Sequence, residues 1–246
     1  MIHVTGQFLD SILRFLSMRI PRAEIVNKDD LVHVYWRCHN RSKYLESKDV
    51  KDKILAVYFE NAERFSIEII DFTIMDNHAH FALKAAGGPE ALGNFTRQAH
   101  SQIAVFINKK LKKDSQVFRD RYKSPVIGGL RVLRIVLAYI LANRLKVNRD
   151  LKPENDPYCS AYHRLNNTPY SKFLKSYSAL GLCPEGEEKE TLLKILKKIS
   201  DELNEVLSFG KSVCSVFVSG DMVENLKRAR AYWLRVLQQR KIVSSA

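Results

Sequence analysis

The stretch that decides the fold is SIEIIDFTIMDNHAHFALK, residues 66–84. Its first part, Ser66 to Met75, is rich in Ile, Phe and Thr, which favour β-strands. Asp76 and Asn77 then give a tight-turn signal, and His78 to Lys84 has the pattern of a second strand. We therefore predict a β-hairpin here, and we interpret the rest of the chain around it.

The segments on either side of the hairpin alternate between strand and helix patterns. Upstream, Leu31 to Arg37 has a strand pattern, and apolar residues at helical spacing predict a helix from Asp49 to Phe65. Downstream, a long helical pattern covers Glu90 to Lys113, and Gln116 to Val126 again has an extended pattern. The resulting order, βαββαβ, predicts an α+β fold, a ferredoxin-like sandwich with helices on one face of an antiparallel sheet.

The second half of the chain is mostly helical in pattern. Leu130 to Val147 is almost wholly apolar and predicts a buried helix. A loop is expected over Asn148 to Thr168, and charged helical sequence follows, such as Glu187 to Leu207 and Asp221 to Lys241. We predict three parts: an N-terminal helix and arm at 1–30, a main domain at 31–165, and a helical C-terminal extension at 166–246.

The chain is strongly basic. Its 40 Lys and Arg against 27 Asp and Glu give a net charge of +13 over 246 residues, so a polyanion is the natural partner. Four cysteines lie far apart without a CxxC pair, which argues against a zinc knuckle or disulfide framework and favours a reducing cytoplasm. No apolar run approaches the roughly 18 residues of a membrane span. We expect a cytoplasmic protein without membrane segments.

Two histidines in the predicted hairpin form a candidate metal site. Residues two apart in a strand point to the same face, so His78 and His80 project side by side and can share one ion. Seven histidines in this chain would give about 0.2 such pairs by chance, so the pair is weak evidence alone.

A tyrosine and an amide share a face of the apolar helix. Tyr139 and Asn143 are four residues apart, so both side chains can meet one target. A buried core tyrosine is the ordinary alternative for such a position. The combination with the histidines is more informative, because covalent cutting of DNA needs a nucleophile and a cation that neutralises charge on the phosphate.

The motif set resembles the HUH single-tyrosine transposases, particularly the REP-associated tyrosine transposase branch. The resemblance runs from about residue 30 to 165. It is carried by MDNHAHF at 75–81, by YILAN at 139–143, and by three flanking segments: VYWRCHNR at 34–41, FRDRYK at 118–123 and PYCSAY at 157–162. The chain departs from the family pattern at Ala79, which is small, at Arg144, which replaces a proline, and in its long C-terminal extension.

The resemblance implies a catalytic residue and a metal site. It makes Tyr139 the nucleophile and Asn143 the third metal ligand beside His78 and His80. Two imidazoles and one amide with open positions suit Mg²⁺ or Mn²⁺. Ala79 is expected to point away from the metal because side chains alternate along a strand.

Two basic segments and the end of the apolar helix are candidates for contact with DNA. An aromatic ring between basic residues can stack on a base, although ordinary surface charge explains these positions equally well. The candidates are His39, Asn40, Arg41, Arg119, Arg121, Tyr122, Lys123, Arg144 and Lys146. His100, Trp36 and Trp233 are expected to have packing roles.

The leading hypothesis is a single-strand DNA endonuclease and strand transferase that cleaves beside DNA hairpins through a 5′-phosphotyrosine. One alternative is a domesticated hairpin-binding regulator that no longer cuts, and another is an HUH replication initiator or relaxase. The partner would be single-stranded DNA with hairpin structure, bound by a monomer or a homodimer. The C-terminal extension is a candidate for further DNA contacts.

Overall fold

A computed structural model of the chain describes residues 26–146 and 149–219. The predicted helix at 1–20, the predicted helix at 221–241 and Trp233 lie outside the described residues. Within the described part, the hairpin is confirmed, with β2 at Glu68–Ile74 and β3 at His78–Lys84. The first strand is confirmed as β1, Leu31–Arg37, and the two helices of the main domain as α2, Lys48–Arg64, and α3, Gly88–Leu111.

The sheet has the order β1-β3-β2, with antiparallel pairing between neighbours. The segment at 117–127 runs beside β1, where Phe118, Lys123 and Val126 make isolated antiparallel bridges. The fourth strand predicted at 116–126 is therefore not a regular strand. Residues 119–121 form a bend, and Pro125 has no N–H to donate to a ladder, so the pairing is interrupted. The arrangement is still that of a ferredoxin-like α+β sandwich.

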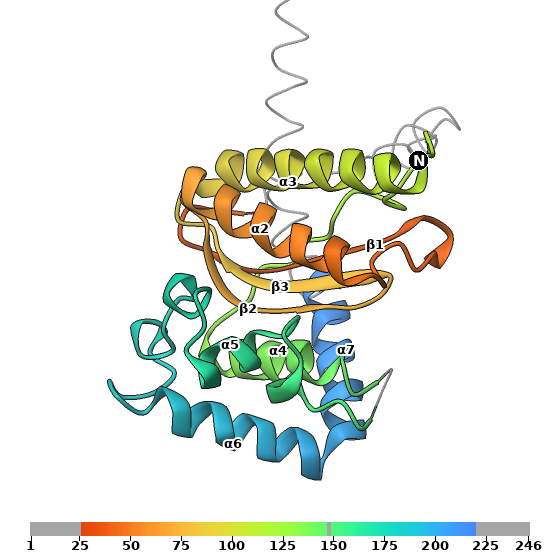
Figure 1. Cartoon of the computed structure of the whole chain (residues 1–246). Helices are drawn as coiled ribbons and strands as arrows, with labels where there is room; N and C mark the ends of the chain where they lie inside the picture. Colours follow the sequence, from red (N-terminus) through yellow and green to blue (C-terminus); the bar gives the residue numbers. More distant parts are fainter. Residues whose placement is uncertain (1–25, 147–148, 220–246) are drawn as a thin grey trace, which may run out of the picture.

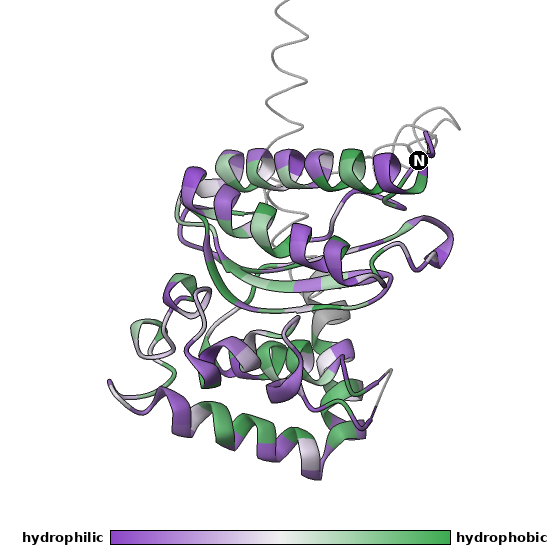
Figure 2. Ribbon diagram, viewed as in Figure 1, coloured by the Kyte–Doolittle hydropathy of each residue, from purple (hydrophilic) through white to green (hydrophobic). Residues whose placement is uncertain are grey.

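Helices cover both faces of the sheet (Figure 1). Helices α2 and α3 lie on one face, over a core that includes Trp36 of β1, Phe72 of β2 and Phe81 of β3. Helix α4, Leu130–Ala142, and helix α5, Ser160–Asn166, lie on the opposite face. Figure 2 shows α4 as mostly hydrophobic and α2 and α3 as amphipathic, as their burial requires.

The C-terminal extension packs on α4. Residues predicted as one helix at 187–207 form two, α6 at Glu188–Asp201 and α7 at Leu203–Ser219, because the backbone leaves the helical conformation at Glu202. Leu192, Leu196 and Val206 are buried in one cluster with Leu137 and Leu141 of α4. The predicted boundary at 165/166 therefore crosses a shared core. Helix α5 lies in a stretch for which a loop is predicted.

A buried ion pair joins α5 to the sheet, and Tyr177 of the C-terminal extension bonds to the same carboxylate. Asp71 lies next to a register shift in β2 and is fully buried. It accepts hydrogen bonds from Arg164 Nε of α5 at 3.0 Å and from the Tyr177 hydroxyl at 2.6 Å. Arg164 also donates to the backbone oxygens of Ile70 and Lys175. The remaining elements are short 3-10 turns at His39–Arg41, Pro153–Asn155, Ser171–Phe173 and Ser178–Leu180.

Candidate active site

The two motif histidines lie at the start of β3, on the sheet face that α4 covers. The register places His80 opposite Tyr35 and His78 opposite Arg37 on β1. Ala79, between them, is fully buried in the other core, as strand alternation predicts. The ring centroids of His78 and His80 are 5.1 Å apart. The two imidazoles therefore project from the same face of β3 and lie close together.

Each motif histidine makes a hydrogen bond through Nδ1. His78 Nδ1 donates to Asn77 Oδ1 at 2.6 Å, and Asn77 is itself oriented by donating from Nδ2 to the backbone oxygen of Arg41. His80 Nδ1 lies 3.0 Å from Nε2 of His33, a buried residue of β1. A metal ion bound at Nε2 of both rings would leave these two hydrogen bonds intact.

Burial keeps the three imidazoles neutral at neutral pH. It lowers the pKa of His33 to about 3. It also lowers the pKa of His78 to about 4, with further lowering from the positive charges of Arg37 and Lys146. Burial likewise holds the pKa of His80 well below its usual value. The neutral ring is the form that binds a metal.

Helix α4 brings Tyr139 and Asn143 to the histidines. The half-buried Tyr139 ring meets His80 and His33 edge-on, with centroids 5.7 Å and 6.1 Å away. Asn143 is 2% exposed, and its Nδ2 donates to the backbone oxygen of Tyr139 at 2.6 Å. The helix predicted to continue to Val147 ends at Ala142, and the Tyr139 carbonyl also accepts from the backbone N–H of Asn143 at 3.2 Å.

These residues line one basic pocket of about 240 Å³. Five of its lining residues are basic and one is acidic, so the pocket attracts anions. The lining consists of Tyr35, Trp36, Arg37, His78, His80, Arg119, Asp120, Arg121, Lys123, Tyr139, Asn143 and Lys146. Residues separated by about 100 positions in sequence thus meet at one site.

The part of the chain that carries these residues is similar to a known protein family. Residues 28–143, which span the sheet and the helix with Tyr139 and Asn143, match the family model described as "Transposase IS200 like". Over this range the chain is similar to the IS200-like transposase family. No curated protein matches significantly.

A solved structure of a REP-associated tyrosine transposase bound to a REP hairpin is also similar to this chain. Its sequence identity is 13% and its TM-score 0.48, and the match covers 56% of this chain and 81% of that one.

Not all of the predicted DNA-contact residues line the pocket. Arg119, Arg121, Lys123 and Lys146 do so and are exposed. His39, Asn40 and Arg41 form the 3-10 turn after β1, outside the pocket lining. Their contact with DNA stays a prediction.

Two further candidates are engaged within the protein. Arg144 Nε forms an ion pair with Asp156 at 2.8 Å, and its Nη1 lies 3.7 Å from Asp76. Its guanidinium therefore holds the chain after α4. Tyr122 is 7% exposed and packs in the core beside His100, so in this conformation its ring is not presented to a base. His100 and Trp36 both pack against Phe118, as expected for packing residues.

Three residues of β1 belong to the site although the sequence analysis assigned them no role. Tyr35 stacks on His80 with centroids 5.7 Å apart, and Lys123 Nζ lies 5.9 Å from the Tyr35 ring centroid. Arg37 lines the pocket, and His33 pairs with His80. Alternation along β1 places these three on one face, but the sequence alone does not reveal which face meets β3 on the α4 side.

The donor set of the pocket fits a divalent cation. Two neutral imidazoles have their Nδ1 atoms engaged, and Asn143 donates through its nitrogen, which leaves its amide oxygen as the ligand atom. In the described residues no group of three or more His, Cys, Asp or Glu gathers as a metal site, and the Asn143 amide oxygen would complete a set with the two imidazoles. Such a mixed nitrogen and oxygen set suits Mg²⁺ or Mn²⁺.

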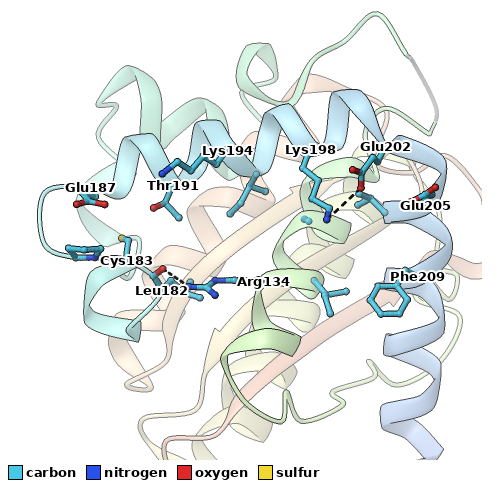
Figure 3. Close-up of a pocket in the computed structure, with 15 residues that line it drawn as sticks. Arg134, Leu182, Cys183, Glu187, Thr191, Lys194, Lys198, Glu202, Glu205 and Phe209 are labelled. Carbon is cyan, nitrogen blue, oxygen red and sulfur yellow. Dashed lines mark hydrogen bonds and ion pairs between the residues drawn. The ribbon is translucent and has the colours of Figure 1, made fainter.

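A larger cavity of about 590 Å³ lies behind α4, between α6 and α7 (Figure 3). It is lined by Ala138 and Phe209 among others, and Arg134 crosses one end to donate to the backbone oxygen of Leu182 at 2.9 Å. None of the predicted site residues lines it. No helix in the described residues is long and apolar enough to cross a membrane.

Proposed function

We propose that this protein is a metal-dependent, single-strand DNA endonuclease and strand transferase that cleaves beside DNA hairpins. The observation that carries the proposal is that Tyr139, Asn143 and the two motif histidines line the same basic pocket. A phenol nucleophile, a metal-ligand set and positive charge for a phosphate are the three components that covalent DNA cleavage requires.

Each residue has a role in the proposed reaction. The Tyr139 oxygen attacks the scissile phosphorus, a P–O bond to tyrosine forms, and the bond to the 3′ oxygen breaks, so that the departing strand takes up a proton as its 3′-hydroxyl. Tyr139 loses its own proton in this step. When bound, the divalent cation polarises a phosphate oxygen and offsets its charge.

The covalent intermediate permits rejoining. A 3′-hydroxyl that attacks the phosphotyrosine restores a phosphodiester and returns the tyrosine, because the phosphotyrosine keeps the energy of the broken bond. The basic residues at the pocket rim hold the DNA backbone. The 5′ attachment and the preference for hairpins follow from the resemblance to REP-associated tyrosine transposases.

The test is the formation of denaturation-resistant protein–DNA adducts on labelled single-stranded hairpins from the flanks of the protein's own gene. We expect adducts with Mn²⁺ that EDTA abolishes and that Tyr139→Phe cannot form. Tyr162→Phe is the matched control, because Tyr162 is a half-buried tyrosine of α5 outside the pocket lining, and it should form adducts normally. Tight hairpin binding without adducts in any variant would instead identify a binding protein that does not cut.

A further inference from the structure

His33 occupies an unusual position for a histidine. It lies in the middle of β1, between Val32 and Val34, and is 1% exposed. A buried imidazole is costly unless its polar atoms are paired. The pairing partner of His33 is not a neighbour in sequence but His80, 47 residues away on β3.

The geometry of the pair restricts the proton positions. His33 Nε2 and His80 Nδ1 are 3.0 Å apart, and the two rings are stacked with an interplanar angle of 21°. Two ring nitrogens at this distance form a hydrogen bond, so one of them carries the proton and donates it to the other. A metal ion binds the ring nitrogen that lacks a proton. His80 can use Nε2 for a metal only when its proton is on Nδ1.

We propose that His33 is a positioning residue for the metal site: it accepts the Nδ1 proton of His80 and so keeps His80 Nε2 available as a ligand. This inference rests on the proposed metal-dependent function. Asn77 Oδ1 has the same relation to His78, because it accepts from His78 Nδ1. Each motif histidine thus has its own acceptor, one adjacent in sequence and one supplied by a neighbouring strand.

Metal-ligand histidines need such a partner because it fixes the ring orientation and the tautomer before the metal arrives. Among the neighbours of His80, only some could bond to its Nδ1 atom. Tyr35 and Tyr139 contact its ring, and Thr73 lies opposite on β2, where its hydroxyl donates to Cys159 Sγ. His33 is the residue whose acceptor nitrogen lies within hydrogen-bond distance of His80 Nδ1.

The test is Mn²⁺ binding to the full chain without DNA, measured by the loss of the free-ion electron paramagnetic resonance signal. His33→Leu removes the acceptor and should weaken binding by about 10- to 100-fold. His33→Gln offers an amide oxygen in its place and should restore most of the affinity. Thr73→Val is the matched control, since it changes a buried neighbour on the other side of His80, and it should bind Mn²⁺ as the wild type does.

These outcomes separate the inference from the proposed function. Wild-type affinity in His33→Leu, or equal weakness in His33→Leu and His33→Gln, would overturn the role of His33 while leaving the metal site in place. A wild-type chain that binds no Mn²⁺ would overturn the metal site and the role of His33 together. Tyr139→Phe should bind Mn²⁺ normally although it forms no adduct.

A second measurement does not depend on the variants folding. Long-range ¹H–¹⁵N correlation spectra of the histidine-labelled wild-type chain report which nitrogen carries the proton in each neutral ring. We expect the proton of His80 on Nδ1 in the wild-type chain. A His80 proton on Nε2 in the wild type would refute the proposal.

Discussion

Gly210 of α7 lies directly against Tyr139 of α4. A Cβ atom at position 210 would come within 2.7 Å of the Cβ, Cγ and Cδ2 atoms of the tyrosine, closer than non-bonded atoms approach. Because Gly210 has no side chain, α7 can pack directly against the proposed nucleophile. The C-terminal extension therefore forms part of the packing around Tyr139.

We expect Gly210→Ala to displace Tyr139 and to slow adduct formation by about 10²-fold, because a shift of about 1 Å in a reacting group has that effect. Hairpin affinity should change little, since the basic rim is untouched. Gly93→Ala is the control: Gly93 lies in α3 with no atom within 4 Å of an added Cβ. Quenched-flow assays measure the rate of adduct formation. Equal rates in Gly210→Ala and the wild type would show that contact with Gly210 does not position Tyr139.

The basic rim of the pocket should govern the salt dependence of DNA binding. Arg121 is exposed and lines the pocket. A plot of the logarithm of the DNA-binding constant against the logarithm of the salt concentration has a negative slope. We expect Arg121→Ala to reduce the magnitude of this slope by about 0.7, the value for one lost phosphate contact on a single strand. Lys189→Ala on the exposed side of α6 should leave the slope unchanged. Fluorescence anisotropy titrations at several salt concentrations measure both slopes. The same slope in Arg121→Ala and the wild type would show that Arg121 does not contact a phosphate of the DNA.

The buried ion pair of Asp71 and Arg164 should contribute strongly to the stability of the protein. We expect Arg164→Met to lower the free energy of unfolding by about 3–5 kcal/mol, because it leaves a buried carboxylate without its charge partner. Lys175→Met breaks the partly exposed pair of Lys175 and Glu68 and should cost about 1 kcal/mol or less. Urea denaturation compares the two variants, and similar losses would mean that burial of Asp71 carries little penalty.

The stability of the protein should fall in mild acid, in part through His163. Burial lowers the pKa of His163, which also bonds to the Pro157 carbonyl and the Thr168 hydroxyl. The unfolded chain therefore takes up this proton at a higher pH than the folded chain does. The contribution of His163 is full above the unfolded-state pKa of 6.5 and is lost as the pH falls through the lower folded-state value.

His163→Gln tests this prediction. The variant should be less stable at pH 7.5, because hydrogen bonds are lost, and its stability should fall less steeply below pH 6.5 than that of the wild type. Thermal unfolding at a series of pH values gives both quantities. Parallel curves for the two proteins would show that His163 does not titrate on unfolding.

Local patterns account for the elements that the sequence predicts correctly. The hairpin at 66–84 and the helices α2 and α3 arise from residue types, periodicity and turn signals that lie within a few residues of one another. The irregular segment at 117–127 contains Pro125, a local signal that the strand prediction did not use, whereas the break between α6 and α7 falls at Glu202 with no Gly or Pro to mark it. Strand alternation also correctly places Ala79 away from the site.

The sequence by itself determined the three strands and the helices α2, α3 and α4, the excess of positive charge, and the identity of His78, His80, Tyr139 and Asn143 as candidates. Only the tertiary structure decided that these four share a pocket, that His33 pairs with His80, and that Gly210 packs against Tyr139. The physical reason is that each of these relations joins residues tens of positions apart, and their distance is set by strand register and helix packing. A one-residue slip of β1 against β3 would turn His33 and Tyr35 to the opposite face of the sheet.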